Sequence, residues 1–516
     1  MNFISKYRYI LILIGLFLLQ FLIVSPVGEF PLNDDWVHAE MVHHWAETGS
    51  FRLNPYTGPM LHLLIAFGTG LVKIFGFSFF ILRLSTLVFT LGIMILFYLL
   101  LHHLTKKSLL SFLVTLTLWL NPIVYNLSFT FMTDIPALFF LIAGIYVGVV
   151  AFEKNDSHYV FLAAVLSVTG FFIRQTNILL LPAIGLPILF YKQYRSWPNF
   201  IALAVPSFVW TIVYFYFRQK NLLPGGQSLH IITNKSELLR HAFWWLYYTI
   251  MYVGLFTLPI TIGIKKINKK TLCFIALLLC IAAAVYYSRQ EYFPYVSNMV
   301  NRFGLGPLND VLQGTYVPLF RTRIWLVVTA LAAIGSGLLF ATLKKSKPDY
   351  VFLWLFVLFF MIPILVFTSF DRYFLPLAAT FLIVITASLS ETPLRYYPGF
   401  IVLGIMAFYS MSQTQFYMEW NKTRWELAER AVKGYDLKTN QVEAGYEWDG
   451  WHEYWNAQSN RAHRGPIGSP WWNKSLIPNN TLEYIVSASP LPGYAIVDHR
   501  IVLGRNPNQN LYLLKK

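Results

Sequence analysis

The sequence predicts a mainly α-helical, polytopic membrane protein with about thirteen transmembrane helices, interfacial helices in its first outer loop and a small mixed α/β C-terminal domain. Composition is the first observation behind this fold class. Of the 516 residues, 56% are hydrophobic and only 12% are charged, whereas soluble domains carry about 25% charged residues. The second observation is the recurrence of long apolar runs, and the third is the position of the basic residues between them.

Most of the apolar runs approach the roughly 20 residues that a membrane-spanning helix needs. The first run follows Lys6 and Arg8 and has no clear cleavage site, so we expect an uncleaved span rather than a signal peptide. Segment 158–191 forms either two short spans or one kinked span, because Pro182 and Pro187 lie in its second half. The expected spans are 9–27, 80–103, 108–127, 134–152, 158–173, 175–191, 199–217, 243–264, 271–287, 324–343, 350–368, 372–389 and 398–412.

Basic residues set the expected orientation. The formal net charge is +16, and its clusters at 106–107, 192–195, 265–270 and 344–347 occupy every second connection between apolar runs. Cytoplasmic loops are enriched in Lys and Arg in this way. We therefore expect a cytoplasmic N-terminus, an extracytoplasmic C-terminus and no nucleic-acid partner.

The outer connections are longer than the cytoplasmic ones and more aromatic. The first outer loop, 28–79, contains the glycine-rich apolar segment "GPMLHLLIAFGTGLVKIFGF", which we expect to lie in the membrane interface. Loops 218–242 and 288–323 follow on the same side. We divide the chain into a membrane domain, 1–412, and a polar C-terminal domain, 413–516, with strands near 483–515.

Two adjacent carboxylates open the first outer loop, in "NDDWVHAEMVHHW". The structural interpretation is a helix start, with Asn33 as N-cap and acidic residues in the first turn. The functional interpretation makes Asp34 or Asp35 a general base at the membrane surface. Asp134 is a third catalytic candidate because it stands at the outer end of a span without a charged neighbour in sequence. Its structural alternative is a helix cap.

His38 follows Asp34 by four residues, so both would share one helix face. This pair is a candidate ligand set for a divalent cation, the only cofactor that the sequence indicates. Two ligands do not complete a metal site, and a solvated interfacial histidine is the alternative.

Arginines at the outer ends of apolar runs depart from the cytoplasmic bias of basic residues. Arg83, Arg174 and Arg372 occupy such positions, and Arg302 lies in an outer loop. Guanidinium groups bind phosphate with two parallel hydrogen bonds. These four residues are therefore candidates for binding a lipid phosphate, and contact with lipid headgroups is the alternative.

An aromatic motif, "GYEWDGWHEYW", stands out in the C-terminal domain. Trp448, Trp451 and His452 are candidates for contacts with a sugar or an acceptor, because aromatic faces stack on sugars. A packed interface with the membrane explains the same composition equally well.

The order of these motifs resembles the GT-C type of membrane glycosyltransferases, which includes protein O-mannosyltransferases, lipid A aminoarabinose transferases and rhizobial lipopolysaccharide-core transferases. The shared elements are an acidic pair opening a helix after the first span, a Pro-led segment ending in "FGF", and the strings "ILRLST", "FMTDIPALFF" and "DRYFLPL". The resemblance covers roughly residues 1–400. Nucleotide-binding fingerprints and the "GxSxG" motif are absent from the sequence.

The resemblance implies a polyprenyl-phosphate-linked sugar donor, a glycan, lipid or protein acceptor, and transfer with inversion at the outer membrane face. Asp34 matches the catalytic base of the family. Two departures are Asp35 in place of Glu and the absence of the usual Lys before the Pro of "TGPML". Arg83, Arg302 or Arg372 would then contact the donor phosphate.

Two further functions are compatible with the sequence. A transporter or flippase of lipid-linked glycans would use the same membrane architecture, although the internal repeats expected of transporters are not visible. A polymerase or ligase of lipid-linked glycans would use the same surface with a larger acceptor. The short cytoplasmic loops favour the inner membrane of a bacterium.

Overall fold

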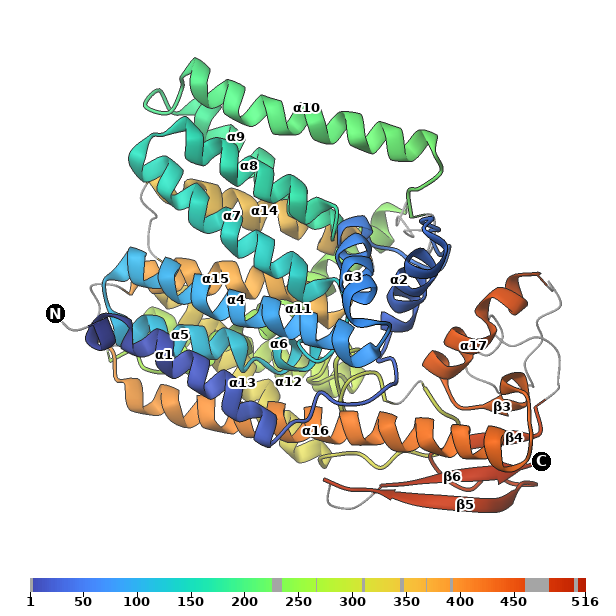
Figure 1. Cartoon of the computed structure of the whole chain (residues 1–516). Helices are drawn as coiled ribbons and strands as arrows, with labels where there is room; N and C mark the ends of the chain where they lie inside the picture. The colour runs from blue at the N-terminus through green and yellow to red at the C-terminus, as the bar shows by residue number, and fades with distance from the viewer. Residues whose placement is uncertain are drawn as a thin grey trace.

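A computed structural model describes residues 3–224, 234–265, 267–308, 311–343, 348–367, 369–389, 393–459, 482–504 and 509–516. The predicted basic cluster at 344–347, Lys266 of the cluster at 265–270 and the predicted strand residues 505–508 lie outside these ranges. The predicted fold class is confirmed: helices dominate, and a small sheet follows in the C-terminal region (Figure 1).

Seven helices of the described chain are long and apolar enough to cross a membrane. Six shorter apolar helices accompany them, so the number thirteen stays a prediction. The long ones are α4 (Phe79–Thr105), α7 (Asp134–Lys154), α10 (Trp197–Gln219), α11 (Lys235–Thr261), α12 (Lys269–Arg289), α13 (Thr322–Thr342) and η4 with α15 (Asp371–Phe374 and Leu375–Ser388). The other helices of this part are α1 (Phe3–Leu19), η1 (Gln20–Leu22), α5 (Ser108–Trp119), α6 (Pro122–Leu127), η3 (Pro348–Tyr350) and α14 (Val351–Val366).

Segment 158–191 forms two helices. Helix α8 (Ser157–Phe171) and helix α9 (Leu180–Phe190) are joined through the 3-10 turn η2 (Gln175–Leu179). Of the two sequence alternatives, the structure adopts the pair of short helices. Pro182 lies in the first turn of α9, where its missing N–H has no intrahelical partner to lose.

Small residues allow the central helices to approach closely. A Cβ atom at Gly335 of α13 would lie 2.3 Å from the carbonyl oxygen of Gly254 in α11. Glycine at such crossings lets the backbones touch, as is common between membrane helices. This crossing fixes the position of α11, which also packs against η4.

The first loop contains two helices, α2 (Asp35–Thr48) and α3 (His62–Phe75), which pack against each other at one end of the bundle (Figure 1). Helix α2 begins later than predicted. Asp34 rather than Asn33 holds the N-cap position, and Asn33 adopts a left-handed backbone conformation with φ of +56°. Residues with φ > 0 are uncommon, but Asn is among those that tolerate it best.

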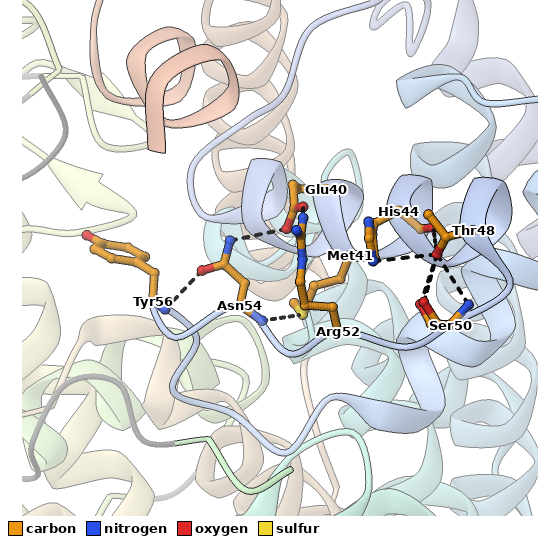
Figure 2. A network of polar contacts seen from close by, with 8 residues as sticks. All are labelled: Glu40, Met41, His44, Thr48, Ser50, Arg52, Asn54 and Tyr56. Atoms are coloured by element: carbon orange, nitrogen blue, oxygen red, sulfur yellow. Dashed lines mark hydrogen bonds and ion pairs between the residues drawn. The ribbon is translucent and has the colours of Figure 1, made fainter. Parts of the chain in front are cut away.

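The segment after α2 is tied back onto that helix (Figure 2). Glu40 accepts hydrogen bonds from Arg52 at one oxygen and from the Asn54 amide at the other, over 2.5 and 3.2 Å. The Asn54 side chain then accepts the backbone N–H of Tyr56 at 3.0 Å. These bonds fix the position of the Tyr56 backbone relative to helix α2.

The C-terminal region is built on one long helix. Helix α16 (Tyr396–Gly434) runs without a break through the predicted domain boundary at 412 and extends beyond the bundle (Figure 1). A four-stranded sheet in the order β3-β4-β6-β5 packs against this extension. Its strands are β3 (Val442–Glu443), β4 (Tyr484–Ser487), β5 (Ala495–Val502) and β6 (Gln509–Lys515), and β3–β4 is the parallel pair.

Helix α17 (Tyr446–Ser459) leads from this sheet back to the first loop, where it packs against α2. The turn η5 (Thr439–Gln441) precedes β3. A small hairpin, β1 (Val300–Asn301) with β2 (Gly304–Leu305), lies in loop 288–323. The first loop, α17 and η4 therefore converge at one end of the helical bundle.

Candidate functional site

The Asp34 carboxylate is the centre of this convergence. Its side chain makes no capping bond to helix α2. Instead, its Oδ2 atom accepts a hydrogen bond from Nη2 of Arg372 at 3.1 Å, and its Oδ1 atom accepts one from the Tyr446 hydroxyl at 2.7 Å. The side chain of Asp34 is still 32% exposed. Each oxygen therefore keeps a lone pair that can accept a further proton or hydrogen bond.

Arg372 has hydrogen-bonding capacity that the described residues leave unused. Its side chain is only 8% exposed, yet its Nε and Nη1 atoms have no hydrogen-bond partner in the described part of the chain. The guanidinium carbon lies 5.3 Å from the ring centre of Phe370 and 5.7 Å from that of Tyr373. A buried guanidinium with two free donors can bind a planar or tetrahedral anion.

Asp371, the neighbour of Arg372, connects this element to the outer loop. Its carboxylate is fully buried and accepts the backbone N–H groups of Met299 at 3.0 Å and Val300 at 2.7 Å. These bonds fix the hairpin loop and the turn that presents Arg372 relative to each other. Sequence reasoning missed this role of Asp371, although it quoted the string "DRYFLPL".

A second ion pair lies next to the first. Asp134 contacts Nη1 of Arg174 at 3.0 Å, and the same nitrogen donates to the Thr133 hydroxyl at 3.0 Å. The Arg174 guanidinium lies 4.6 Å from the Tyr373 ring centre, so both arginines flank this ring. Arg372 interacts electrostatically with Asp134 as well as with Asp34. The structure therefore brings Asp34, Asp134, Arg174 and Arg372 together.

Asp35 has different surroundings from Asp34. It is 3% exposed, and its two oxygens accept the backbone N–H groups of Leu32 at 2.5 Å and Phe131 at 3.2 Å. Burial raises the pKa of Asp35 to about 8, against the opposing effects of Arg83 and the two N–H donors. These contacts tie α2 to the segment that precedes α7.

Arg83 lies apart from the ion pairs. It is 1% exposed, and its guanidinium donates to the carbonyl oxygens of Pro26, Gly28 and Phe30 at 2.5, 3.2 and 2.8 Å. These bonds organise the chain that leads into the first loop. Arg302 is exposed and lies over the ring of Tyr292 at 4.2 Å.

His38 lies close to both ion pairs. Its Nδ1 atom is 2.9 Å from the carbonyl oxygen of Phe131, so Nδ1 carries the hydrogen and Nε2 keeps the lone pair. Burial lowers the pKa of His38, which favours this neutral form. However, no group of three His, Cys, Asp or Glu residues among those described is arranged to hold a metal ion.

The predicted aromatic residues of the tail pack against protein in this structure. Trp451 stacks on Phe77 with ring centres 5.6 Å apart. Trp448 is buried against Trp425 and His452, at 4.9 and 4.3 Å. These contacts are within the protein, so both the membrane interface and the sugar contact stay predictions.

Tyr446 is the functional candidate that the sequence interpretation did not single out. It belongs to the aromatic motif already noted, but nothing in the sequence pairs it with Asp34, because 412 positions separate the two residues. The Arg424–Glu447 ion pair was missed for the same reason. Its atoms lie 2.7 Å apart, and both side chains are fully buried.

The chain is similar to a family of known proteins and to two solved structures. Among solved structures, ArnT from Cupriavidus metallidurans bound to undecaprenyl phosphate matches with 10% identity, a TM-score of 0.45, and coverage of 84% of this chain and 72% of that chain. Apo ArnT from the same organism matches with 10% identity, a TM-score of 0.40 and 98% coverage of both chains. The search of curated proteins gave no match. Residues 56–217 match the model of the dolichyl-phosphate-mannose-protein mannosyltransferase family, a family of the GT-C type that the sequence resembles.

Proposed function

We propose that the protein transfers a sugar from a polyprenyl-phosphate-linked donor to an acceptor hydroxyl at the membrane surface, with Asp34 as the general base. The observation that carries this proposal is the Asp34 carboxylate, which is partly exposed and bonded at both oxygens by Arg372 and Tyr446. A base must be within reach of the proton that it removes, and it must be held in position. The two bonds hold Asp34 in position, and its partial exposure leaves it open to an acceptor hydroxyl.

The contrast with Asp35 supports the choice between the two adjacent carboxylates. Asp35 is nearly inaccessible, and both of its oxygens are used by backbone N–H groups. An acceptor hydroxyl would have to displace one of these bonds to reach it. Asp34 offers free lone pairs on a partly exposed side chain, so it is the better candidate for the base. Asp35 is the better candidate for supporting the turn.

Arg372 is the best candidate for binding the donor phosphate. Its Nε and Nη1 donors are buried and lack partners among the described residues, although unpaired buried donors are costly. A lipid phosphate would supply acceptors for both. Arg174 adds a second cation beside Tyr373, and Asp134 would orient it through their ion pair.

The proposed reaction is a single displacement. The acceptor oxygen attacks the anomeric carbon, and its proton passes to Asp34. The bond between the anomeric carbon and the phosphate oxygen breaks, with its electron pair leaving on polyprenyl phosphate. Arg372 stabilises the charge that develops on the departing phosphate. Attack opposite the leaving group inverts the anomeric configuration.

Among the described residues, no third His, Cys, Asp or Glu joins the two metal candidates to form a site. Arg372 already bonds to Asp34 and places a positive charge there, which disfavours a divalent cation at the same carboxylate. His38 and Asp34 are two ligands, fewer than a metal site normally has. The proposed step therefore uses the arginines alone.

The location in the cell is also a proposal. Helices long enough to span a membrane make this an integral membrane protein. We propose a bacterial inner membrane, with the N-terminus in the cytoplasm and Asp34 on the outer side, because basic clusters occupy alternate connections. Labelling of single cysteines introduced at Lys107 and at Ser50 in intact cells tests this orientation: only the cysteine at Ser50 should react with an impermeant maleimide.

The function is tested with purified protein in lipid nanodiscs and a panel of radiolabelled undecaprenyl-phosphate sugars carrying mannose, glucose, galactose or aminoarabinose. Water serves as the probe acceptor, so release of free sugar reports on slow donor cleavage. The wild-type protein should cleave at least one donor, and Asp34→Asn should lower kcat by about 1,000-fold. Asp498→Asn, an exposed carboxylate paired with Arg430, is the matched control.

Full activity of Asp34→Asn would overturn the assignment of the base. A wild-type protein that cleaves none of the donors but moves a fluorescent polyprenyl-phosphate lipid between leaflets would support the transporter instead. The two functions therefore give different results in the same nanodisc and liposome preparations.

A further inference from the structure

Two neighbouring residues of the tail contact two neighbouring residues of the first loop. Tyr446 bonds to Asp34, and Oε1 of Glu447 accepts the backbone N–H of Asn33 at 2.9 Å. We propose that Tyr446 is a positioning residue for Asp34 and that the C-terminal region, through α17, completes the catalytic centre. This inference rests on the proposed function.

The Tyr446 hydroxyl is well suited to orient a carboxylate. Burial, together with the charge of Asp34 and the nearby Tyr56, raises the pKa of Tyr446 well above its ordinary value. The hydroxyl therefore stays protonated and donates to Oδ1, while Arg372 donates to Oδ2. Donors at both oxygens fix the carboxylate plane, so the remaining lone pairs point in set directions.

Glu447 and Arg424 hold Tyr446 in place. The Arg424 guanidinium contacts Glu447 Oε2 at 2.7 Å and donates to the Ala444 carbonyl oxygen at 3.1 Å and to Asn421 at 2.7 Å. Glu447 in turn bonds to the N–H of Asn33, whose left-handed backbone forms the turn before Asp34. A buried ion pair tolerates little displacement, because either charge alone would be costly.

Aromatic packing brings α17 against the first loop at the same point. The fully buried Trp36 ring lies 5.9 Å from the ring of Tyr446, 5.5 Å from that of Tyr454 and 5.7 Å from that of Tyr56. A Cβ atom at Gly450 would lie 2.4 Å from the Trp36 ring, so only glycine permits this approach. The network of Figure 2 holds Tyr56 in this cluster.

The experiment compares Tyr446→Phe with Tyr454→Phe. Both changes remove one buried hydroxyl from α17 and keep the ring against Trp36, but only the first removes a bond to Asp34. With the undecaprenyl-phosphate sugar that the wild type cleaves, Tyr446→Phe should lower kcat by about tenfold and leave KM unchanged. The acid limb of its kcat–pH profile should also move to higher pH, because the ionised carboxylate loses a donor. Tyr454→Phe should keep the wild-type kcat and profile.

The outcomes separate this inference from the proposed function. If Asp34→Asn is inactive and Tyr446→Phe keeps the wild-type kcat and pH profile, the inference fails and the base assignment stands. If Asp34→Asn is active, the base assignment itself fails. Equal losses in Tyr446→Phe and Tyr454→Phe, without a shifted profile, would reduce the role of Tyr446 to packing and would also overturn the inference.

Glu447→Gln tests the support behind Tyr446. Gln keeps an acceptor for the Asn33 N–H but removes the charge that faces Arg424. We expect a lower melting temperature and a kcat–pH profile displaced in the same direction as in Tyr446→Phe. An unchanged profile in a folded Glu447→Gln protein would contradict the claim that this pair positions Tyr446.

Discussion

The hydroxyl of Tyr446 donates a 2.7 Å hydrogen bond to the Asp34 carboxylate across 412 positions of sequence. Arg372 reaches the other oxygen of the same carboxylate from an element 338 positions away. Three distant parts of the chain thus meet at one side chain. The fold brings them together because the first loop, η4 and α17 all lie at the same end of the helical bundle.

Replacement of Arg372 by Gln should weaken binding of the lipid phosphate. Gln cannot supply the charge or the two free donors that Arg372 presents. We expect the Kd for undecaprenyl phosphate, measured by native mass spectrometry, to rise about tenfold, as for loss of a charge-assisted hydrogen bond. Arg430→Gln, which removes an exposed arginine paired with Asp498, is the control. Equal Kd values for the two variants would exclude Arg372 from phosphate binding.

Replacement of Asp35 by Asn should reduce stability more than chemistry. The Asn side chain offers one acceptor, so its NH₂ group would face one of the backbone N–H groups of Leu32 and Phe131. Leaving a buried donor unsatisfied costs about 1–3 kcal/mol. We expect a lower melting temperature, whereas the turnover per folded molecule at low temperature should stay within a few-fold of the wild type. A loss of turnover as deep as that of Asp34→Asn, in a protein with wild-type stability, would assign the base to Asp35.

Much of the architecture could be predicted from the sequence because membrane insertion depends on local composition. A window of about 20 residues is enough to identify an apolar run as a membrane span, a basic cluster as a cytoplasmic loop and a polar stretch as a segment outside the membrane. The strands near 483–515 were predicted on similar local grounds. The unbroken course of helix α16 through residue 412 was not predicted: its polar extension keeps residues that favour a helix, without a Pro or Gly, until Gly434.

The site was predictable in its residues but not in its pairings. Asp34, Asp134, Arg174 and Arg372 were identified as charges out of place near apolar segments, and these four lie together. Arg83 carries the same sequence signal but bonds to backbone carbonyls instead. Local sequence shows that a charge is unusual, whereas only the tertiary fold determines which partner neutralises it.

Chelation of divalent cations should leave donor cleavage intact. Arg372 supplies the positive charge beside Asp34, and no group of three His, Cys, Asp or Glu among the described residues is arranged to hold a metal ion. We expect the purified protein to keep its kcat after dialysis against EDTA, with potassium sulfate of equal ionic strength as the control. Loss of activity that Mg²⁺ or Mn²⁺ restores would show that a metal, held by Asp34 and His38 or elsewhere, takes part.

The stability of the C-terminal region should depend on pH through Asp449. This carboxyl is 1% exposed, and its Oδ2 atom has no hydrogen-bond partner in the described part of the chain. Burial and the charge of Glu443 raise the pKa of Asp449 well above its ordinary value. The folded state therefore binds a proton that the unfolded state releases above about pH 4.

The sign of the effect follows from this difference in proton binding. The stability that the proton provides is fully present below about pH 4 and is lost progressively as the pH rises toward the raised pKa of the folded state. Asp449→Asn cannot ionise and keeps an acceptor for the N–H of Ala444, so it should melt at a higher temperature than the wild type at pH 7.5. The difference should shrink toward pH 4.5. The melting temperature of Asp498→Asn, which changes an exposed carboxylate, should vary with pH as that of the wild type does. The same pH dependence for Asp449→Asn would refute the prediction.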